Sequence, residues 1–332
     1  MTGVLASQPF IDGFGDELAR AAAAENRSIE FITPPAAAGA RLSAAQCARV
    51  ECAYLDRDLR FVEQLHAAFW DAARAAVDLR WIHFVSSALN PHPYLSGLTA
   101  RGVRFTTSTG SNAEPVAQTG FTGLLSLARR FPAYLEAQRK REWRPLRGAA
   151  LPPDLAGQTV VLVGVGAVGT VFAGYCKAFG MKVIGVRRSP RGGEPVDEMH
   201  PPARLGELLP RADWLVLCCP LTAETRALID ARMLAQLPRG ARLVNISRGE
   251  VIDQPALIAA LTDGRLAGAH LDVFAQEPLA ADSPLWALPN VIVTPHNASA
   301  STGNAGRAAR IFIANFARWA RGEPLANEAR AD

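Results

Sequence analysis

The sequence predicts an α/β protein with two parallel-sheet domains, and three observations support this. The chain has 332 residues, which is more than one hydrophobic core usually serves. In residues 1–118, short apolar segments alternate with alanine-rich amphipathic segments. Over residues 158–296 the alternation is sharper, with β-branched runs between helical stretches. Such alternation is typical of a parallel sheet with covering helices, and the second region is typical of a doubly wound sheet.

The individual elements follow from composition and periodicity. In the first region we expect strands over 50–54, 80–85 and 103–107 and a helix over 61–77. A helical stretch runs from 115 to about 144, where Pro132 should kink or break it, and a turn-rich connector follows at 151–157. The second region is predicted to hold a helix over 255–261 and strands over 159–163, 182–186, 215–218, 242–246, 267–273 and 291–294. A last helix is expected over 303–320.

Composition narrows the class of protein. The formal charge is +4, and the densest basic run, from Arg139 to Arg147, is typical of a solvated helix end, so no nucleic-acid partner is expected. None of the five cysteines forms a Cys-x-x-Cys pair, which suits a reducing compartment. We see neither a signal peptide nor an apolar stretch long enough for a bilayer. The expectation is a cytoplasmic enzyme with no membrane contact and no metal site.

A glycine loop follows the strand over 159–163. It reads Gly164-Val165-Gly166-Ala167-Val168-Gly169, and a helix is predicted to begin within it. Gly164 permits the tight turn, Gly166 lets the backbone approach a pyrophosphate, and Gly169 lets helix and strand pack closely. The helix N-terminus offers free N–H groups to phosphate. With this context the motif predicts a dinucleotide site, whereas a glycine-rich turn is the structural alternative.

The residues after the second strand of this region indicate which dinucleotide binds. An NAD site usually places an acid there, about 20 residues after the loop, to hold the ribose 2′-hydroxyl. This chain instead has Arg187, Arg188 and Ser189, with no acid before Glu194. Arginine and serine can bind a 2′-phosphate that an acid would repel, so NADP(H) is predicted, with NAD(H) as the alternative. The competing interpretation is that these arginines are solvated surface residues.

Three residues in strand-end positions suggest hydride-transfer chemistry. Arg248, Glu277 and His296 each follow a predicted strand, where ligands bind in this fold. Taken alone, each has a simpler structural explanation: Arg248 as a capping residue, Glu277 as a solvated loop acid and His296 as a loop histidine. Together they supply what a nicotinamide enzyme needs from its protein. His296 can act as acid and base, Glu277 is a carboxylate that favours the protonated imidazole, and the Arg248 guanidinium can bind a substrate carboxylate through two hydrogen bonds.

The sequence also resembles a known family. The stretches that carry the resemblance are 163–169, 220–226, 245–253, 271–279 and 289–296, including Asn245-Ile246-Ser247-Arg248-Gly249 and Thr294-Pro295-His296. In order and spacing they are similar to the D-2-hydroxyacid dehydrogenases, which include glyoxylate/hydroxypyruvate reductases and phosphoglycerate dehydrogenase. The resemblance covers most of the chain and is strongest from about Leu155 to Ala300.

The resemblance implies a role for each matching residue. Arg248 would bind the substrate carboxylate and carbonyl, His296 would donate the proton in reduction, and Glu277 would hydrogen-bond His296. Asp272 and the backbone of Ile246 would lie near the nicotinamide. Further cofactor contacts are expected from Gly164, Gly166, Ala167, Val168, Gly169, Arg187, Arg188, Ser189, Cys219, Pro220, Thr225, Ser247, Arg248, His296 and Ser299.

The family's architecture gives the expected fold class. It implies two Rossmann-like doubly wound domains with a cleft between them, the substrate domain being discontinuous. Here that would be a flavodoxin-like domain of residues 1–118 plus 299–332 and a cofactor domain of residues 119–298, with a helical arm near 119–145 at a homodimer interface.

The substrate loop departs from the family pattern. Where the family has a Ser-Ala-Gly-Val-Asp-like loop, this chain reads Ser86-Ser87-Ala88-Leu89-Asn90, and Ala88 in place of glycine suggests a different loop conformation. Ala88 and Leu89 would bind substrate through their backbone. Gln118 replaces an acid usual in the family. These changes bear on the substrate pocket and leave the chemistry intact.

The leading hypothesis is an NADPH-preferring reductase of small 2-oxoacids, glyoxylate and hydroxypyruvate first among them. The alternatives are a dinucleotide-sensing regulatory protein without turnover and an NAD-dependent dehydrogenase such as a phosphoglycerate dehydrogenase. Formate or phosphite oxidation ranks lower, because formate dehydrogenases of this kind place glutamine where Glu277 stands.

Overall fold

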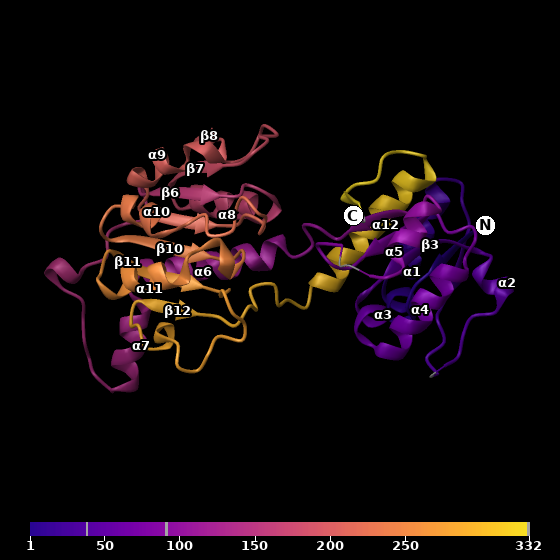
Figure 1. Ribbon diagram of the computed structural model, residues 1–332, viewed down its shortest axis with the longest axis horizontal. Coiled ribbons are helices and arrows are strands. Elements are labelled where there is room, and N and C mark those ends of the chain that lie inside the picture. The colour runs from indigo at the N-terminus through magenta and orange to yellow at the C-terminus, as the bar shows by residue number, and fades with distance from the viewer. Residues whose placement is uncertain (38, 90–91, 331–332) are drawn as a thin grey trace. The chain divides into compact units, whose positions relative to one another are not determined.

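The protein, described here from a computed structural model, forms two compact units. Unit 1 is Met1–Asn112 with Ser301–Asp332, and unit 2 is Ala113–Ala300. The structure describes residues 1–37, 39–89 and 92–330. Figure 1 shows the two units, which are treated separately below. Residues 113–118 and 299–300, which the sequence suggested for the first domain, fall in unit 2, because residue 113 begins a continuous helix that packs on the second sheet.

Unit 1 contains a six-stranded sheet in the order β13-β5-β4-β3-β1-β2. Its strands are β1 (Thr2–Leu5), β2 (Ile29–Ile32), β3 (Val50–Leu55), β4 (Trp81–Phe84), β5 (Arg104–Thr107) and β13 (Glu328–Ala329). The first five are parallel and follow the flavodoxin-like order 2-1-3-4-5, whereas β13 pairs antiparallel with β5. The expected parallel sheet is therefore present, together with β1 and β2, which the sequence analysis did not identify.

Unit 1 also contains several α-helices, some of which begin at side-chain caps. They are α1 (Gln8–Ala24), α2 (Ala44–Cys47), α3 (Arg57–Phe61), α4 (Glu63–Ala75), α5 (Leu95–Ala100) and α12 (Asn304–Ala320). Ser7 and Asp56 accept hydrogen bonds from the first turns of α1 and α3. The C-terminal helix α12 packs against α1, and its Phe312 stacks on Tyr54 with ring centroids 4.9 Å apart. Two distant parts of the chain thus share one core.

Unit 2 contains a seven-stranded parallel sheet in the order β12-β11-β10-β9-β6-β7-β8. Its strands are β6 (Thr159–Val163), β7 (Lys182–Val186), β8 (Glu198–His200), β9 (Trp214–Leu217), β10 (Ala241–Asn245), β11 (Leu266–Leu271) and β12 (Val291–Val293). Counted from β6, the order is 7-6-5-4-1-2-3, which contains the Rossmann order. The order reverses between β6 and β9, and this is where such folds bind ligands.

The helices of unit 2 cover this sheet. They are α6 (Ala113–Ala128), α7 (Phe131–Arg139), α8 (Ala167–Ala178), α9 (Leu205–Leu208), α10 (Ala231–Gln236) and α11 (Gln254–Thr262). Short 3-10 turns occur at Gly148–Ala150, Pro202–Arg204, Leu209–Arg211, Gly249–Val251 and Pro284–Trp286. The expected break near Pro132 lies between α6 and α7, where Arg130 has φ +61° and Pro132 sits in the first turn of α7.

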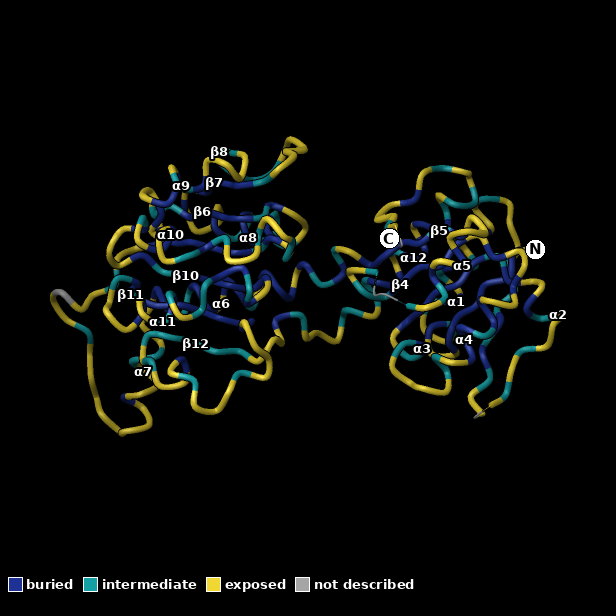
Figure 2. Tube along the Cα trace, in the orientation of Figure 1, coloured by how far each residue is buried: buried dark blue, intermediate teal, exposed yellow. Residues whose placement is uncertain are grey.

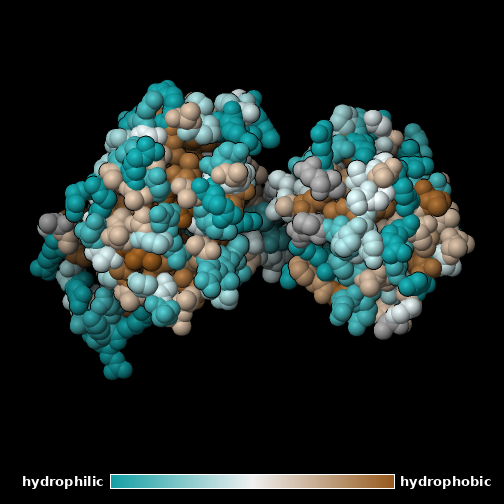
Figure 3. All heavy atoms as spheres, in the orientation of Figure 1, coloured by the Kyte–Doolittle hydropathy of each residue, from teal (hydrophilic) through white to brown (hydrophobic). Residues whose placement is uncertain are grey.

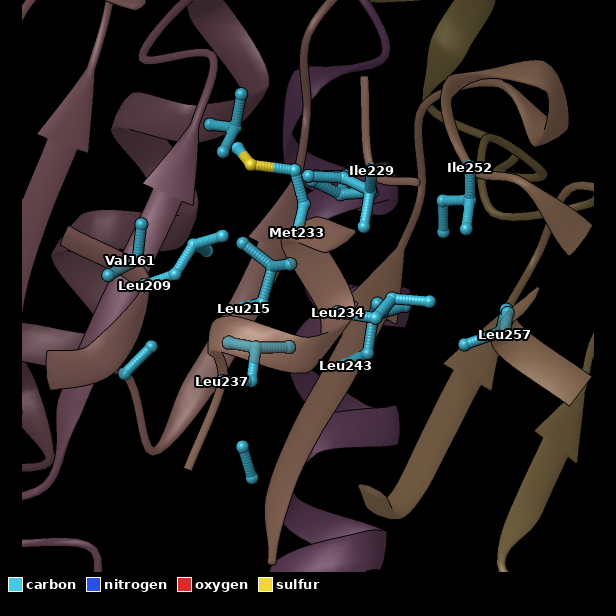
Figure 4. Close-up of a cluster of buried hydrophobic side chains, with 14 of the residues drawn as sticks. Val161, Leu209, Leu215, Ile229, Met233, Leu234, Leu237, Leu243, Ile252 and Leu257 are labelled. Atoms are coloured by element: carbon cyan, nitrogen blue, oxygen red, sulfur yellow. The ribbon is translucent and has the colours of Figure 1, made fainter. Parts of the chain in front are cut away.

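Apolar side chains fill both faces of the second sheet. Val161, Leu215 and Leu243, from three strands, lie with Leu234 of α10 in one buried cluster (Figure 4). Buried strands of this kind read as continuous apolar runs, which is why the sequence located them well. Each fully buried aliphatic side chain contributes roughly 1.5–3 kcal/mol. The sheet is thus a rigid support for the loops at its carboxyl edge.

Exposed loops surround the buried strands in each unit (Figure 2). Hydrophilic residues cover much of the face seen in Figure 3, with scattered apolar patches. Within the described residues no helix combines the length and apolar character needed to cross a membrane.

Candidate cofactor and active site

The glycine loop joins β6 to α8. Gly164 has φ +97°, and a Cβ there would lie 2.5 Å from the backbone nitrogen of Cys219. A Cβ on Gly169 would lie 2.1 Å from the carbonyl oxygen of Gly164, so strand and helix approach too closely for a side chain. A Cβ on Gly166 would meet nothing within 4 Å. Its backbone therefore faces open space in front of α8, whose first residues Ala167 and Val168 present helix N-terminal N–H groups.

A cavity of about 540 Å³ opens beside this loop at the carboxyl ends of β6, β7 and β9. It brings together Gly164, Gly166, Arg187, Arg188, Ser189, Cys219, Pro220 and Thr225 from the predicted set, and it adds Pro202, Thr222, Glu224 and Leu228. Burial raises the pKa of Cys219 to about 11, so its thiol is neutral at ordinary pH. The apolar walls, the bare glycine backbone and the cationic rim fit the adenosine and phosphate parts of a dinucleotide.

Arg187 and Arg188 are adjacent in sequence but differ in their contacts. Arg187 is largely buried, and its Nη1 donates to the carbonyl of Val165 at 2.6 Å and lies 3.3 Å from Glu194 Oε1. Glu194 also accepts the Arg191 N–H at 2.9 Å, and this bond with other backbone N–H groups and the Arg187 charge lowers its pKa. Arg187 therefore ties the glycine loop to the segment after β7. It lines the cavity together with the exposed Arg188 and Ser189.

Glu224 is an acid in the cavity wall that the sequence analysis did not single out. Thr222 Oγ1 donates to its carboxylate at 2.7 Å. That bond is the main reason its pKa is lowered, and the charge of Arg188 contributes. The cavity thus holds one carboxylate close to the arginine that would meet a phosphate.

The Arg248 loop leaves the end of β10 and is fixed by a buried amide. Asn245 accepts from the Ser247 N–H and hydroxyl at 3.1 and 2.8 Å and donates to the Arg248 carbonyl at 3.1 Å. A Cβ on Gly249 would lie 1.8 Å from the Phe274 carbonyl carbon, so the loop presses on the backbone after β11. Arg248 donates to the Ser247 carbonyl at 2.6 Å and keeps an exposed side chain. Ile246 and Ser247 are buried beneath it.

His296 and Glu277 form a close imidazole–carboxylate pair at this edge. His296 Nδ1 lies 2.6 Å from Glu277 Oε2, and Glu277 Oε1 accepts the Phe274 N–H at 3.0 Å. Partial burial raises the pKa of Glu277, but the hydrogen bonds from His296 and Phe274 and the charges of His296 and Arg248 outweigh it and lower the pKa. Because the carboxylate can only accept, Nδ1–H is the donor, and Nε2 is left to hold or release a proton.

Asp272 anchors the loop that carries His296. Its carboxylate accepts the Thr294 hydroxyl at 2.6 Å and the N–H groups of Asn297 and Ala298 at 3.0 and 3.1 Å. Its backbone carbonyl accepts the His296 N–H at 2.7 Å. Asp272 is 2 % exposed. In this structure its side chain is thus engaged in holding the loop, in addition to the nicotinamide contact that the family resemblance implies.

The remaining predicted residues lie elsewhere. Ala88 and Leu89 belong to unit 1, where Ser86 donates to the Ala88 carbonyl at 2.6 Å and Thr109 to the Ser87 carbonyl at 2.7 Å. Ala88 is not among the non-glycine residues with positive φ, so its methyl group imposes no backbone strain. Asn90 lies outside the described residues.

Two predicted positions lie in unit 2. Gln118 of α6 donates to Glu114 at 2.9 Å. Ser299 is half-buried, close after the His296 loop.

Sequence reasoning missed several residues that hold the loops of the site in place by hydrogen bonds. Asn245 and Thr294 stood inside the matching stretches but were assigned no role, and Glu194 was noted only as the first acid. His270, 1 % exposed in β11, was not noticed. A histidine in an otherwise apolar strand was the signal that could have found it.

Comparison with known proteins matches this arrangement to one family. The model of the D-isomer specific 2-hydroxyacid dehydrogenase NAD-binding domain matches residues 121–298. A glyoxylate reductase from Korarchaeum cryptofilum is 39% identical over 235 residues, 68% of each chain. A D-3-phosphoglycerate dehydrogenase from Mycobacterium tuberculosis is 36% identical over 67% of this chain and 41% of its own.

Solved structures agree on the fold. A D-isomer specific 2-hydroxyacid dehydrogenase family protein from Aeromonas salmonicida superposes with a TM-score of 0.72 at 31% identity, covering 100% of this chain and 99% of its own. A family member from Xanthobacter autotrophicus in complex with NADPH has a TM-score of 0.69 at 29% identity, covering 99% and 98%. The chain therefore belongs to the D-isomer specific 2-hydroxyacid dehydrogenase family and is an NAD(P)-dependent oxidoreductase.

Proposed function

We propose that the enzyme is an NADPH-preferring reductase of small 2-oxoacids of the glyoxylate and hydroxypyruvate type, forming D-2-hydroxyacids. The observation that carries the proposal is the 2.6 Å pair of His296 and Glu277, in the same unit as the exposed Arg248 and the cavity beside the glycine loop. The glyoxylate reductase at 39% identity supports the substrate class.

The residues divide the chemistry between them. Arg248 binds the substrate carboxylate through its guanidinium fork. When bound, the nicotinamide supplies a hydride, two electrons and one hydrogen, to C2 of the oxoacid. Protonated His296 delivers the second hydrogen as a proton to the carbonyl oxygen, so that the ketone or aldehyde becomes a hydroxyl group. Glu277 accepts a hydrogen bond from Nδ1 of His296 and so fixes the tautomer and orientation of the imidazole.

The cofactor preference rests on the end of β7. Arg188 and Ser189 face the cavity, and no acid stands at the position where an NAD site holds its ribose. A 2′-phosphate would gain charge-assisted bonds there. The Xanthobacter relative, whose structure contains NADPH, supports this preference.

Exchange of the proton donor tests the proposal. His296→Ala should reduce kcat for glyoxylate and hydroxypyruvate by at least about 100-fold, the range of general acid catalysis, while NADPH binding stays nearly unchanged. The control is His200→Ala, since His200 also pairs with a carboxylate, Glu198 at 2.9 Å, outside the site. Unchanged turnover of His296→Ala would exclude this role.

A panel of oxoacids tests the substrate class. Glyoxylate, hydroxypyruvate, pyruvate, phenylpyruvate and branched 2-oxoacids are each assayed with NADPH and NADH. The highest kcat/KM is expected for the two small acids with NADPH. Tight NADPH binding without turnover on any acid would instead identify a dinucleotide-sensing protein, and efficient turnover with NADH alone would indicate an NAD-dependent dehydrogenase.

We also propose a homodimer and a cytoplasmic location. α7 and the segment after it expose Phe131, Tyr134, Leu135 and Trp143, the last at 97 %, which is typical of a surface that a partner covers. Light scattering should give twice the chain mass, and a monomer at micromolar concentration would contradict the dimer. All five cysteines are free, which suits a reducing compartment.

A further inference from the structure

We infer that Thr294, oriented by the buried His270, is a positioning residue for the proton donor His296 and acts on it through the Asp272 carboxylate. The inference rests on the role proposed above for His296. It concerns two side chains that lie behind the site and take no part in the chemistry itself.

A continuous chain of hydrogen bonds joins β11 to the catalytic loop. His270 Nε2 lies 3.2 Å from Thr294 Oγ1, and Thr294 Oγ1 donates to Asp272 Oδ1 at 2.6 Å. The Asp272 carboxylate then accepts two backbone N–H groups from the residues just after His296. Each link is short enough to fix the orientation of the next group.

The donor directions in this chain are determined by Asp272. An ionised carboxylate has no proton to give, so the single hydroxyl hydrogen of Thr294 is committed to Asp272. Thr294 can therefore only accept from His270, and His270 must carry its proton on Nε2. Burial lowers the pKa of His270, which keeps the ring neutral, although the nearby Asp272 charge and a hydrogen bond with the Gly120 backbone oppose this shift. Neutral His270 with Nε2–H is thus the form that completes the chain.

α6 holds the other edge of the His270 ring. A Cβ on Gly123 would lie 2.0 Å from His270 Nδ1, so the ring occupies the space that this glycine leaves open. Nδ1 is buried and has no partner that meets full hydrogen-bond geometry among the described residues, although a contact between the ring and the Gly120 backbone of α6 raises the pKa of His270. Such a group is unfavourable in a protein interior. The contact of Nε2 with Thr294 Oγ1 at 3.2 Å is the hydrogen bond of the ring that meets full geometry.

The backbone of His296 shows why the anchor matters. His296 has φ +49°, a left-handed conformation that a non-glycine residue keeps only when its surroundings enforce it. The enforcing contacts come from Asp272, by its backbone carbonyl and by its carboxylate. Without the Thr294 hydroxyl, one oxygen of that carboxylate loses its side-chain partner. The loop is then held less firmly, and the orientation of the His296 imidazole is less well fixed. Small misplacements of a proton donor reduce kcat strongly.

Matched substitutions test the inference. Thr294→Val removes the hydroxyl at constant shape, and we expect kcat to fall about tenfold, the effect of losing one hydrogen bond to a charged group. NADPH binding, measured by fluorescence titration, should change less than about twofold if only the proton donor moves. Thr294→Ser restores the hydroxyl and should recover most of kcat. Thr262→Val is the control, because its hydroxyl donates to the Ile258 carbonyl of its own helix, α11.

Two His270 variants separate the ring nitrogens. Glutamine places an amide near the position of Nε2 and asparagine near that of Nδ1, so His270→Gln should retain more kcat than His270→Asn. Nitrogen-15 NMR of the wild-type enzyme reads the tautomer without any substitution. A neutral His270 protonated on Nε2 is expected, and a ring protonated on Nδ1 alone would overturn the inference even if the variants fail to fold.

The outcomes separate this inference from the proposed function. If His296→Ala abolishes turnover while folded Thr294→Val keeps the wild-type kcat, the positioning role is wrong and the proton donor stands. If His296→Ala retains turnover, the proposed function itself fails. Equal losses in Thr294→Val and Thr294→Ser would also contradict the role of the hydroxyl.

Discussion

The two neighbouring arginines after β7 should respond differently to the same substitution. Arg188 is exposed and lines the cavity, and in the proposed site it binds the 2′-phosphate, so Arg188→Ala should remove that contact and leave the rest of the cofactor's contacts in place. Arg187 is tied to the glycine loop through the Val165 carbonyl at 2.6 Å, and Glu194 at 3.3 Å offsets its charge. Arg187→Ala therefore loosens the loop that serves NADPH and NADH alike.

The magnitudes follow from the contacts. A hydrogen bond to a charged group contributes about 1.5–3 kcal/mol, and 1.4 kcal/mol is a factor of ten. Arg188→Ala should lower kcat/KM for NADPH roughly 10- to 150-fold and leave that for NADH nearly unchanged. Because Arg187 is paired with an acid, its loss should cost about 1 kcal/mol, or roughly fivefold, with both cofactors.

The decisive quantity is the ratio of kcat/KM for NADPH to that for NADH. It is measured at saturating glyoxylate for the wild type, the two variants and Arg239→Ala, an exposed arginine outside the cavity. The ratio should fall in Arg188→Ala and stay constant in Arg187→Ala. A fall confined to Arg187→Ala would refute the separation of roles, and an NADH preference of the wild type would refute the phosphate site.

Three further substitutions probe the catalytic edge. Glu277→Gln should lower kcat about 10- to 100-fold by removing a hydrogen bond to a charged group. Because the pKa of Glu277 is lowered, its ionised carboxylate contributes stability that is present above the ordinary glutamate pKa and is lost as pH falls through the lowered value. The melting temperature of the variant should therefore depend less on pH in this acidic range. Gly249→Ala should destabilise by about 1–3 kcal/mol or more in urea unfolding, since backbone must move, whereas Gly13→Ala, with open space around it, should not. Asn245→Ala should raise the KM for glyoxylate, and an unchanged KM would show that the Arg248 loop holds without the amide.

Sequence patterns located the strands whose burial makes them continuously apolar. β6 and β7 match the predicted ranges, and β9 and β10 differ by one residue at each end. β8, with the polar sequence Glu-Met-His, carries no such pattern and was not predicted. The edge strand β2 is short and preceded by charged residues, so it too lacks a clear signal.

The motifs of the candidate site could be predicted from the sequence, but the contacts between its residues could not. The sequence placed Arg187 and Arg188 in one role because they are neighbours. Their separation depends on Glu194 and on the Val165 carbonyl, which folding brings to Arg187. The network behind His296 likewise joins residues from β11 and the loop after β12 with a glycine of α6. Such long-range contacts are properties of the packed chain and leave no local periodicity.

The order in which the chain is synthesised has a consequence for how it folds. The core of unit 1 contains Phe10, Tyr54 and Trp81 from its first part but also Phe312 and Phe316 of α12. All of unit 2, Ala113–Ala300, has been synthesised before α12, so at that point the core of unit 1 still lacks the side chains of this helix. Because domains generally fold as units during synthesis, unit 2 should reach its native state first, and the aromatic face of the earlier-made sheet must wait for α12. If the ribosome stalls after unit 2 has been synthesised but before α12 has, the incomplete core of unit 1 stays exposed, and the chain is then most open to chaperones and to aggregation.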